Sequence, residues 1–108
     1  MENLIDKISV KRVKDYIKYF NSNLDILVLK TSARTAKDAA ISLNCEVGAI
    51  VKSLLLKINK KFLICLVAGD KKCSLSKLKI ILQENDISMA SADEVKIYTG
   101  FSIGGVAP

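Results

Sequence analysis

The residue whose type and placement are most suggestive of chemistry is Lys52, the lysine near the middle of an apolar run over residues 46–58. At the two-residue period of a β-strand it shares a face with Leu54 and Leu56. An ammonium group that is buried and unpaired is costly. Lys52 is therefore expected either to extend to the rim of the core, as strand lysines commonly do, or to meet a phosphate or a carbonyl group. This stretch alone leaves both interpretations open.

A second candidate is the glycine-rich segment 100–108, which holds three of the five glycines and ends in proline. Its notable residues are Gly100, Gly104, Gly105 and Pro108. Glycines let backbone N–H and C=O groups approach a ligand closely, and a proline fixes the path of a loop. Taken alone, the segment could equally be a plain turn before a further strand.

The residues that are absent restrict the chemistry. The sequence has no histidine, which excludes Ser-His-Asp and Cys-His catalytic units and any histidine metal site. Three cysteines, Cys45, Cys65 and Cys73, form neither a disulfide framework nor a paired zinc motif, and we expect reduced thiols, with Cys65 filling the core. Chemistry would have to use lysine, carboxylates, hydroxyls, backbone groups, water or the substrate itself.

The composition predicts one soluble domain. The chain has 108 residues, 50% of them hydrophobic, and a net charge of +6 from 17 basic residues. Basicity suits a polyphosphate partner, although a lysine-rich composition also follows from an AT-rich coding sequence. No stretch is long and apolar enough for a membrane helix, and the N-terminus carries acidic residues where a signal peptide is basic. We therefore expect a cytoplasmic protein with no membrane partner.

The elements that must position these residues can be placed from periodicity and caps. Helices are predicted after Ser9, after Thr35 through Leu43, after Ser74 to Leu82, and from a capping box at Ser91–Glu94 to Gly100. Strands are predicted at 25–29, 46–58 and 62–68, the last two as an antiparallel pair with 62–68 fully buried. Helices mixed with hairpin-like strands indicate an α+β domain.

Four segments occur in a fixed order and together resemble the YbaK/prolyl-tRNA-synthetase-associated editing domain family. They are Arg34-Thr35-Ala36 with Ala39-Ala40, Ile50 to Leu54, Val67 to Asp70, and Thr99-Gly100-Phe101 leading into Gly104 to Pro108. The resemblance covers residues 25–108. No single segment is specific, because a lysine in a strand and a glycine-rich loop are both common, but the ordered set is.

The resemblance implies a mixed, largely antiparallel sheet curved into an open barrel with surrounding helices. It also implies a trans-editing deacylase that hydrolyses the ester of a mischarged tRNA, without metal or cofactor. Lys52 would hold the aminoacyl-adenosine end, and Gly104 and Gly105 would position the attacking species through backbone groups. The expected substrate-binding residues are Thr31, Ser32, Arg34, Ser53, Gly100 and Pro108. For Thr31, Ser32 and Ser53, local hydrogen bonding is an equally good explanation.

The sequence departs from the family at its end, since relatives continue into further strands. We therefore expect a single editing domain over 1–108 that is incomplete at its C-terminus and leaves an open sheet edge. The alternative function is a catalytically inactive remnant that binds tRNA or a synthetase through its lysines. A mischarged tRNA and an aminoacyl-tRNA synthetase are the partners considered, and DNA is not. The amino acid removed, the tRNA and the oligomeric state stay open.

Overall fold

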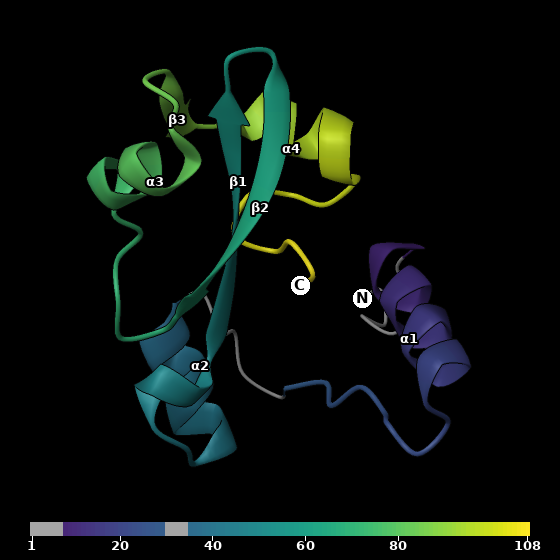
Figure 1. Ribbon diagram of the computed structural model, residues 1–108. Coiled ribbons are helices and arrows are strands. Elements are labelled where there is room, and N and C mark those ends of the chain that lie inside the picture. Colours follow the sequence, from purple (N-terminus) through teal and green to yellow (C-terminus); the bar gives the residue numbers. More distant parts are fainter. Residues whose placement is uncertain (1–7, 30–34) are drawn as a thin grey trace. The chain divides into compact units, whose positions relative to one another are not determined.

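A computed structural model describes residues 8–29 and 35–108 (Figure 1). The chain divides into two compact units, Met1–Ser32 and Ala33–Pro108, and each is described by itself. The prediction of one domain over 1–108 stays a prediction.

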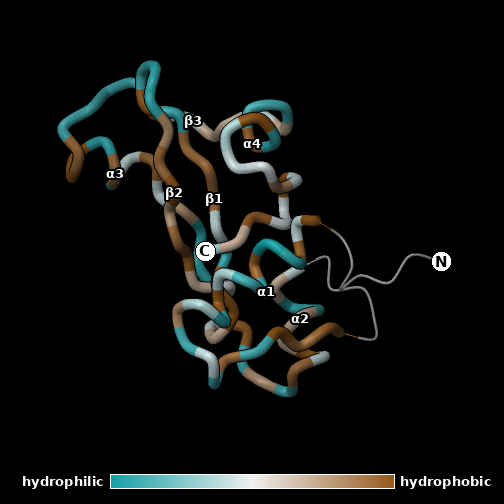
Figure 2. The backbone as a smooth tube through the Cα atoms, turned by 90° about the vertical axis from the view of Figure 1, so that its right-hand side faces the viewer, coloured by the Kyte–Doolittle hydropathy of each residue, from teal (hydrophilic) through white to brown (hydrophobic). Residues whose placement is uncertain are grey.

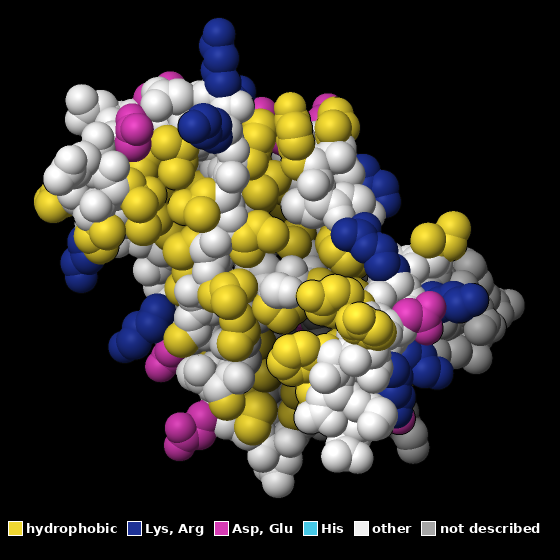
Figure 3. All heavy atoms as spheres, turned by 45° about the vertical axis from the view of Figure 1, so that its right-hand side comes forward, with side chains coloured by type: hydrophobic (Ala, Val, Ile, Leu, Met, Phe, Trp, Pro, Cys, Tyr) yellow, Lys and Arg dark blue, Asp and Glu magenta, His cyan; other side chains and the backbone are white. Residues whose placement is uncertain are grey.

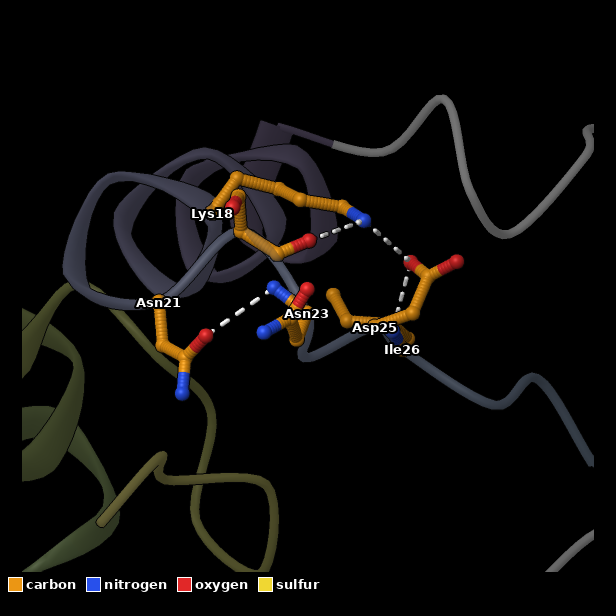
Figure 4. Close-up of polar contacts among 6 residues, drawn as sticks. Lys18, Asn21, Asn23, Asp25 and Ile26 are labelled. Atoms are coloured by element: carbon orange, nitrogen blue, oxygen red, sulfur yellow. Dashed lines mark hydrogen bonds and ion pairs between the residues drawn. The ribbon is translucent and has the colours of Figure 1, made fainter.

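The first unit contains helix α1, Ile8–Phe20. Ser9 is its second residue, so the prediction that Ser9 caps the helix is wrong. After the helix the chain is held by local hydrogen bonds (Figure 4). The ammonium of Lys18 donates to the Ser22 carbonyl at 3.5 Å and lies 3.8 Å from the Asp25 carboxylate, and the Asn21 side chain accepts from the Asn23 amide. These contacts satisfy backbone groups at the helix end.

The strand predicted at 25–29 is also wrong, because this segment pairs with no strand in the described residues. Its branched side chains favour an extended backbone, but a strand also needs a neighbour for its ladder. Leu27 is 71% exposed, so the segment contributes little burial.

The second unit is built on a three-stranded antiparallel sheet, which confirms the α+β prediction. The strands are β1 (Val51–Ile58), β2 (Lys61–Ala68) and β3 (Ile87–Met89), in the order β2-β1-β3. β1 and β2 form a hairpin in full register from Val51↔Ala68 to Ile58↔Lys61. β3 is three residues long and was not predicted, since so short a run shows no readable alternation.

The predicted strand 46–58 is too long at its start. Val47–Ala49 form a 3₁₀ helix, η2, and β1 begins only at Val51. The Ile50 amide donates to the Val47 carbonyl at 3.1 Å, and this local bond holds the backbone in a turn. Apolar composition alone does not distinguish such a turn from the strand that follows it.

The prediction that β2 is fully buried is wrong as well. Only Val67 is buried, while Leu66 is 57% exposed. β2 is an edge strand in the described sheet, so its apolar side chains are covered only in part. The core instead lies around β1, where Leu55, Ala90 and Val95 are buried and Phe62 and Val106 pack against them. Figure 2 shows the hydrophobic character of the hairpin strands.

Three helices surround the hairpin, and each of their predicted N-caps is confirmed. They are α2 (Ala36–Leu43), α3 (Leu75–Leu82) and α4 (Ala92–Thr99), with Thr35, Ser74 and Ser91 as caps. The Ser91–Glu94 capping box is complete. α2 lies at the end of the hairpin where β1 begins, and β3 and α4 lie towards its turn (Figure 1).

Candidate functional site

The second unit contains a pocket of about 580 Å³ beside the first half of β1. Its wall comes from the start of α2, from the segment before β1, from β1 itself and from the C-terminal loop. The lining residues are Thr35, Ala36, Lys37, Ala39, Val47, Ile50, Val51, Lys52, Ser53, Leu54, Leu55, Gly69, Met89, Ala90, Val95, Ile103, Gly104 and Val106. Figure 3 shows hydrophobic side chains exposed over much of one face of the molecule.

The pocket lies where the sheet leaves β1 unpaired on one side. β3 pairs with β1 only from Leu56 to Ile58, and one further bond joins the Ala90 amide to the Leu55 carbonyl. In an antiparallel ladder, alternate residues direct their backbone groups to opposite neighbours. The Gly69 amide bonds the Ile50 carbonyl, so the even-numbered residues of β1 face β2. The N–H and C=O of Ser53 therefore point to the side that β3 does not reach.

Ser53 also carries a hydroxyl without a partner. Its Oγ is buried and makes no hydrogen bond with any described residue. A buried hydroxyl without a partner costs roughly 1–3 kcal/mol. Ser53 therefore offers the pocket an unpartnered hydroxyl together with backbone groups that β3 does not reach.

Lys52 lies on the pocket wall, and its ammonium has a backbone partner. Its Nζ donates to the carbonyl oxygen of Lys71 at 2.6 Å. Lys71 belongs to the turn after β2, and Lys52 itself is half-buried. Because neighbouring residues of a strand point to opposite faces of the sheet, the Lys52 side chain projects from the face opposite to that of Ser53. The ammonium has three N–H donors, so it can contact a ligand phosphate or carbonyl in addition to Lys71 or in its place.

The start of α2 contributes polar backbone to the pocket. The Thr35 hydroxyl accepts from the Asp38 amide at 3.1 Å, which fixes the helix start. The first N–H groups of a helix have no intrahelical acceptor and carry the positive end of its dipole. Ala36 and Lys37, in this first turn, are among the residues that line the pocket.

Gly69 explains how α2 comes so close to the sheet. A Cβ placed there would lie 2.3 Å from the Val47 carbonyl oxygen and 3.0 Å from the Ala36 Cβ. Real Cβ atoms do not approach other atoms that closely, so only glycine fits without a shift of the backbone. The motif Val67 to Asp70 therefore has a packing role at the pocket wall.

The C-terminal glycines occupy different environments. Gly104 lines the pocket with φ of 81°, and no atom lies within 4 Å of a Cβ placed there. Gly105 donates its amide to the Ser102 carbonyl at 2.9 Å. Gly100 is the left-handed C-cap of α4 with φ of 78°. Neither Gly105, Gly100 nor Pro108 lines the pocket.

The structure thus brings Lys52, Ser53 and Gly104 to one pocket among the expected site residues. Thr31, Ser32 and Arg34 lie outside the described residues. The sequence interpretation did not include Thr35, Ala36 or Met89 as wall residues. Thr35 and Ala36 belong to the recognised motif and could have been included, whereas Met89 is positioned by the unpredicted strand β3.

Two side chains near the core have shifted pKa values. The pKa of Glu94 is lowered, first by the hydrogen bond from the Ser91 backbone and then by Lys57, whose Nζ lies 3.2 Å away. Burial raises the pKa of the Cys73 thiol, and the neighbouring Cys65 raises it further. Within residues 8–29 and 35–108, no group of histidine, cysteine and carboxylate side chains could hold a metal ion.

Residues 30–108 match the family described as the aminoacyl-tRNA editing domain. The chain belongs to the aminoacyl-tRNA editing domain family. The match begins just before α2 and includes every element of the pocket wall. None of the helices in the described residues is long and apolar enough to cross a membrane.

Individual relatives agree with this membership. The chain is 31% identical over 81 residues to a proline–tRNA ligase of Caldicellulosiruptor saccharolyticus and 36% identical over 81 residues to that of Thermosipho africanus. Each alignment covers 75% of this editing-domain chain and 14% of the ligase. A solved structure described as a candidate trans-editing enzyme for prolyl-tRNA synthetase has a TM-score of 0.84 and 36% identity, covering 93% of this chain and 64% of that one. The chain therefore spans only part of the length of these relatives.

Proposed function

We propose that the chain is an aminoacyl-tRNA deacylase that acts in trans on a mischarged tRNA. The observation that carries this is the pocket itself, where Lys52, Ser53 and Gly104 meet the start of α2 in a chain that belongs to the editing-domain family. The likeness to a candidate trans-editing enzyme supports the same assignment.

The proposed reaction uses water together with groups that line this pocket. Water attacks the carbonyl carbon of the ester, the bond to the ribose oxygen breaks, and that oxygen takes a proton from the water as the amino acid leaves. An acyl ester is already activated, so holding the water and ester in position supplies much of the acceleration. Backbone N–H groups that face the developing oxyanion supply more. Ala36 and Lys37 at the start of α2 and Gly104 in the loop are the candidate donors.

Lys52 is proposed to hold the 3′ end of the tRNA. Its ammonium exchanges the Lys71 carbonyl, an uncharged acceptor, for a phosphate or ester oxygen of the substrate. A hydrogen bond between two charged groups is stronger than one to a neutral carbonyl, so a phosphate would favour the exchange. Ser53 is proposed to contact the substrate through its unused hydroxyl or backbone groups.

The test is hydrolysis of tRNAs charged with alanine, cysteine, serine or threonine by the full chain. Lys52→Ala should reduce kcat/KM for the accepted substrate by about tenfold or more, the loss expected when a charge-assisted hydrogen bond of about 1.5–3 kcal/mol is removed. Lys60→Ala is the matched control, since Lys60 is exposed in the hairpin turn. Lys52→Ala should unfold at a somewhat lower urea concentration than Lys60→Ala, because it loses the bond to the Lys71 carbonyl, and both variants should be folded under the assay conditions. Equal turnover by Lys52→Ala and the wild type would refute the role of Lys52.

A second candidate function is tRNA or synthetase binding without catalysis, which the net charge of +6 favours. Binding through lysine–phosphate contacts weakens steeply as salt rises. Salt-sensitive tRNA binding by a folded chain that hydrolyses none of the four esters would select this function over the first. A chain that binds neither tRNA nor a synthetase at low salt has neither function.

A further inference from the structure

The thiols of Cys65 and Cys73 lie against each other on β2 and the segment that follows it. Their sulfur atoms are 4.0 Å apart, and both side chains are half-buried. Cys65 is in the middle of β2, and Cys73 directly precedes Ser74, the N-cap of α3. Cys45, the third free cysteine, is exposed. Neither member of the pair takes part in the reaction proposed above.

The same segment also holds Lys52. Cys65 pairs with Leu54, so it lies on the face of the sheet from which Lys52, two residues before Leu54, projects. Residues 69–73 return over this face, with the Lys71 carbonyl accepting from the Lys52 ammonium and the Cys73 thiol meeting Cys65. The thiol pair and the lysine contact are therefore two side-chain contacts that join this segment to the hairpin, beside the backbone bonds from the Gly69 amide to the Ile50 carbonyl and from the Lys71 amide to the Ala68 carbonyl.

We propose that Cys65 and Cys73 are an oxidation site, and that their reversible disulfide fastens residues 69–73 over Lys52. A disulfide requires the sulfurs to approach to about 2.05 Å. Cys73 lies outside the helices and strands, so its backbone can move towards Cys65 without breaking the pairing of β2 with β1.

The oxidant is a small-molecule disulfide such as oxidised glutathione. One cysteine thiolate attacks a glutathione sulfur, forms a mixed disulfide and releases one glutathione thiolate. The second cysteine, as its thiolate, then attacks the protein sulfur and releases the other glutathione. The two cysteines lose two electrons and two protons, and the glutathione disulfide becomes two thiols. Excess reduced glutathione reverses both steps.

The disulfide should make the Lys52 ammonium less accessible. In the reduced chain the side-chain contacts that hold residues 71–73 to the hairpin are the bond from Lys52 to the Lys71 carbonyl and the thiol contact, so a local opening of these residues releases the ammonium. In the oxidised chain the Lys71 carbonyl stays beside Lys52, and the ammonium is less often free. Lys52 should then react more slowly with an amine-acetylating reagent, while Lys60 in the hairpin turn should react at an unchanged rate.

The first measurement is peptide mapping by mass spectrometry after the full chain is incubated in oxidised glutathione and free thiols are alkylated. The expected product is a Cys65–Cys73 crosslink with no glutathione on either residue, and Cys45→Ser should give the same crosslink. The proposal is overturned if Cys65 and Cys73 remain free or each carry glutathione. Such mixed disulfides would show that the second thiol does not resolve the mixed disulfide on the first.

The second measurement is the acetylation rate of Lys52 relative to Lys60 in the reduced and the crosslinked chain. We expect the ratio to fall at least about threefold on oxidation, as the fraction of open segment falls. In Cys73→Ser, which cannot form the link, glutathione should leave the ratio unchanged. An unchanged ratio in a fully crosslinked wild type would overturn the coupling to Lys52. Both readouts are independent of deacylation, so they do not depend on the function proposed above.

Discussion

At the scale of single residues, Gly69 should tolerate no side chain. A Cβ at this position would lie 2.3 Å from the Val47 carbonyl oxygen, so the backbone of η2 or β2 would have to move. We expect Gly69→Ala to lower the free energy of unfolding by about 1–3 kcal/mol, as overpacking does in other cores. The measurement is the urea midpoint at constant slope.

Gly105→Ala is the matched control for that change. The nearest atom to a Cβ at Gly105 is the Ser102 carbonyl oxygen at 3.5 Å, an ordinary contact. Its urea midpoint should stay close to that of the wild type. If both alanine variants lost the same stability, close packing at Gly69 would not be the cause.

The substitution Ser53→Ala should affect stability and activity differently. Its buried hydroxyl has no partner in the described residues, so removing it relieves a desolvation cost. Ser53→Ala should therefore keep or raise the free energy of unfolding by up to about 1 kcal/mol, and it should lower turnover of a mischarged tRNA if the hydroxyl contacts substrate. A large loss of stability would indicate that the hydroxyl has a structural partner after all.

At the scale of elements, the helix caps of the second unit were predictable from the sequence, whereas the cap predicted at Ser9 was wrong because α1 already includes Ile8. The caps Thr35, Ser74 and Ser91 were predicted correctly because each depends on a few neighbouring residues. The errors at 25–29, 46–50 and in the burial of β2 share another cause. Whether an apolar run becomes a buried strand depends on which partner lies beside it, and that is a long-range property.

The same distinction applies to the pocket. Lys52 and Gly104 were recognised from their motifs, and both reach the pocket wall. The bond from Lys52 to Lys71 was not predictable, because it joins a strand to a turn 19 residues later. One side of β1 is unpaired because β3 is short, and no pattern of residues predicted β3.

The cap of α3 can be tested against a neighbour of the same type. The Ser74 hydroxyl accepts from the Lys77 amide at 3.2 Å, whereas Ser76 is exposed within the helix. Ser74→Ala should lower the free energy of unfolding by about 1 kcal/mol, the usual value of an N-cap. Ser76→Ala should change it little or raise it slightly, because alanine is the better helix former. Thermal or urea unfolding of the two variants decides the point, and equal effects would contradict the capping role.

The contact between β1 and α4 should make stability depend on pH. The folded pKa of Glu94 is lowered by the Ser91 backbone and by Lys57, so folding favours the ionised carboxylate. Its contribution is present above the ordinary pKa of 4.5 and is lost as the pH falls through the lower folded value. Glu94→Gln should therefore be less stable than the wild type at pH 7, and the difference should disappear in acid. Urea unfolding from pH 7 to pH 3 measures this, and a difference that persists unchanged at low pH would contradict it.

At the scale of the whole molecule, the outer edge of β2 determines which surface is open to association. The register places the backbone groups of Leu63, Cys65 and Val67 towards β1 and those of Ile64 and Leu66 away from it. No strand in the described residues covers that outer edge, and Ile64 and Leu66 are 42% and 57% exposed. An edge of this kind is a template for pairing with another strand.

Amide hydrogen exchange measures, for each residue of β2, whether its N–H group is bonded within the sheet. In dilute monomeric protein, the amides of Ile64 and Leu66 should exchange at least about tenfold faster than those of Leu63, Cys65 and Val67, because only the latter are bonded within the sheet. If raising the protein concentration slows the exchange of the Ile64 and Leu66 amides alone, a second copy of the chain covers the edge. Added tRNA should leave this alternation intact, since the pocket lies on the opposite side of β1. Uniform protection along β2 in the dilute monomer would contradict the register and with it the placement of Ser53 beside the pocket.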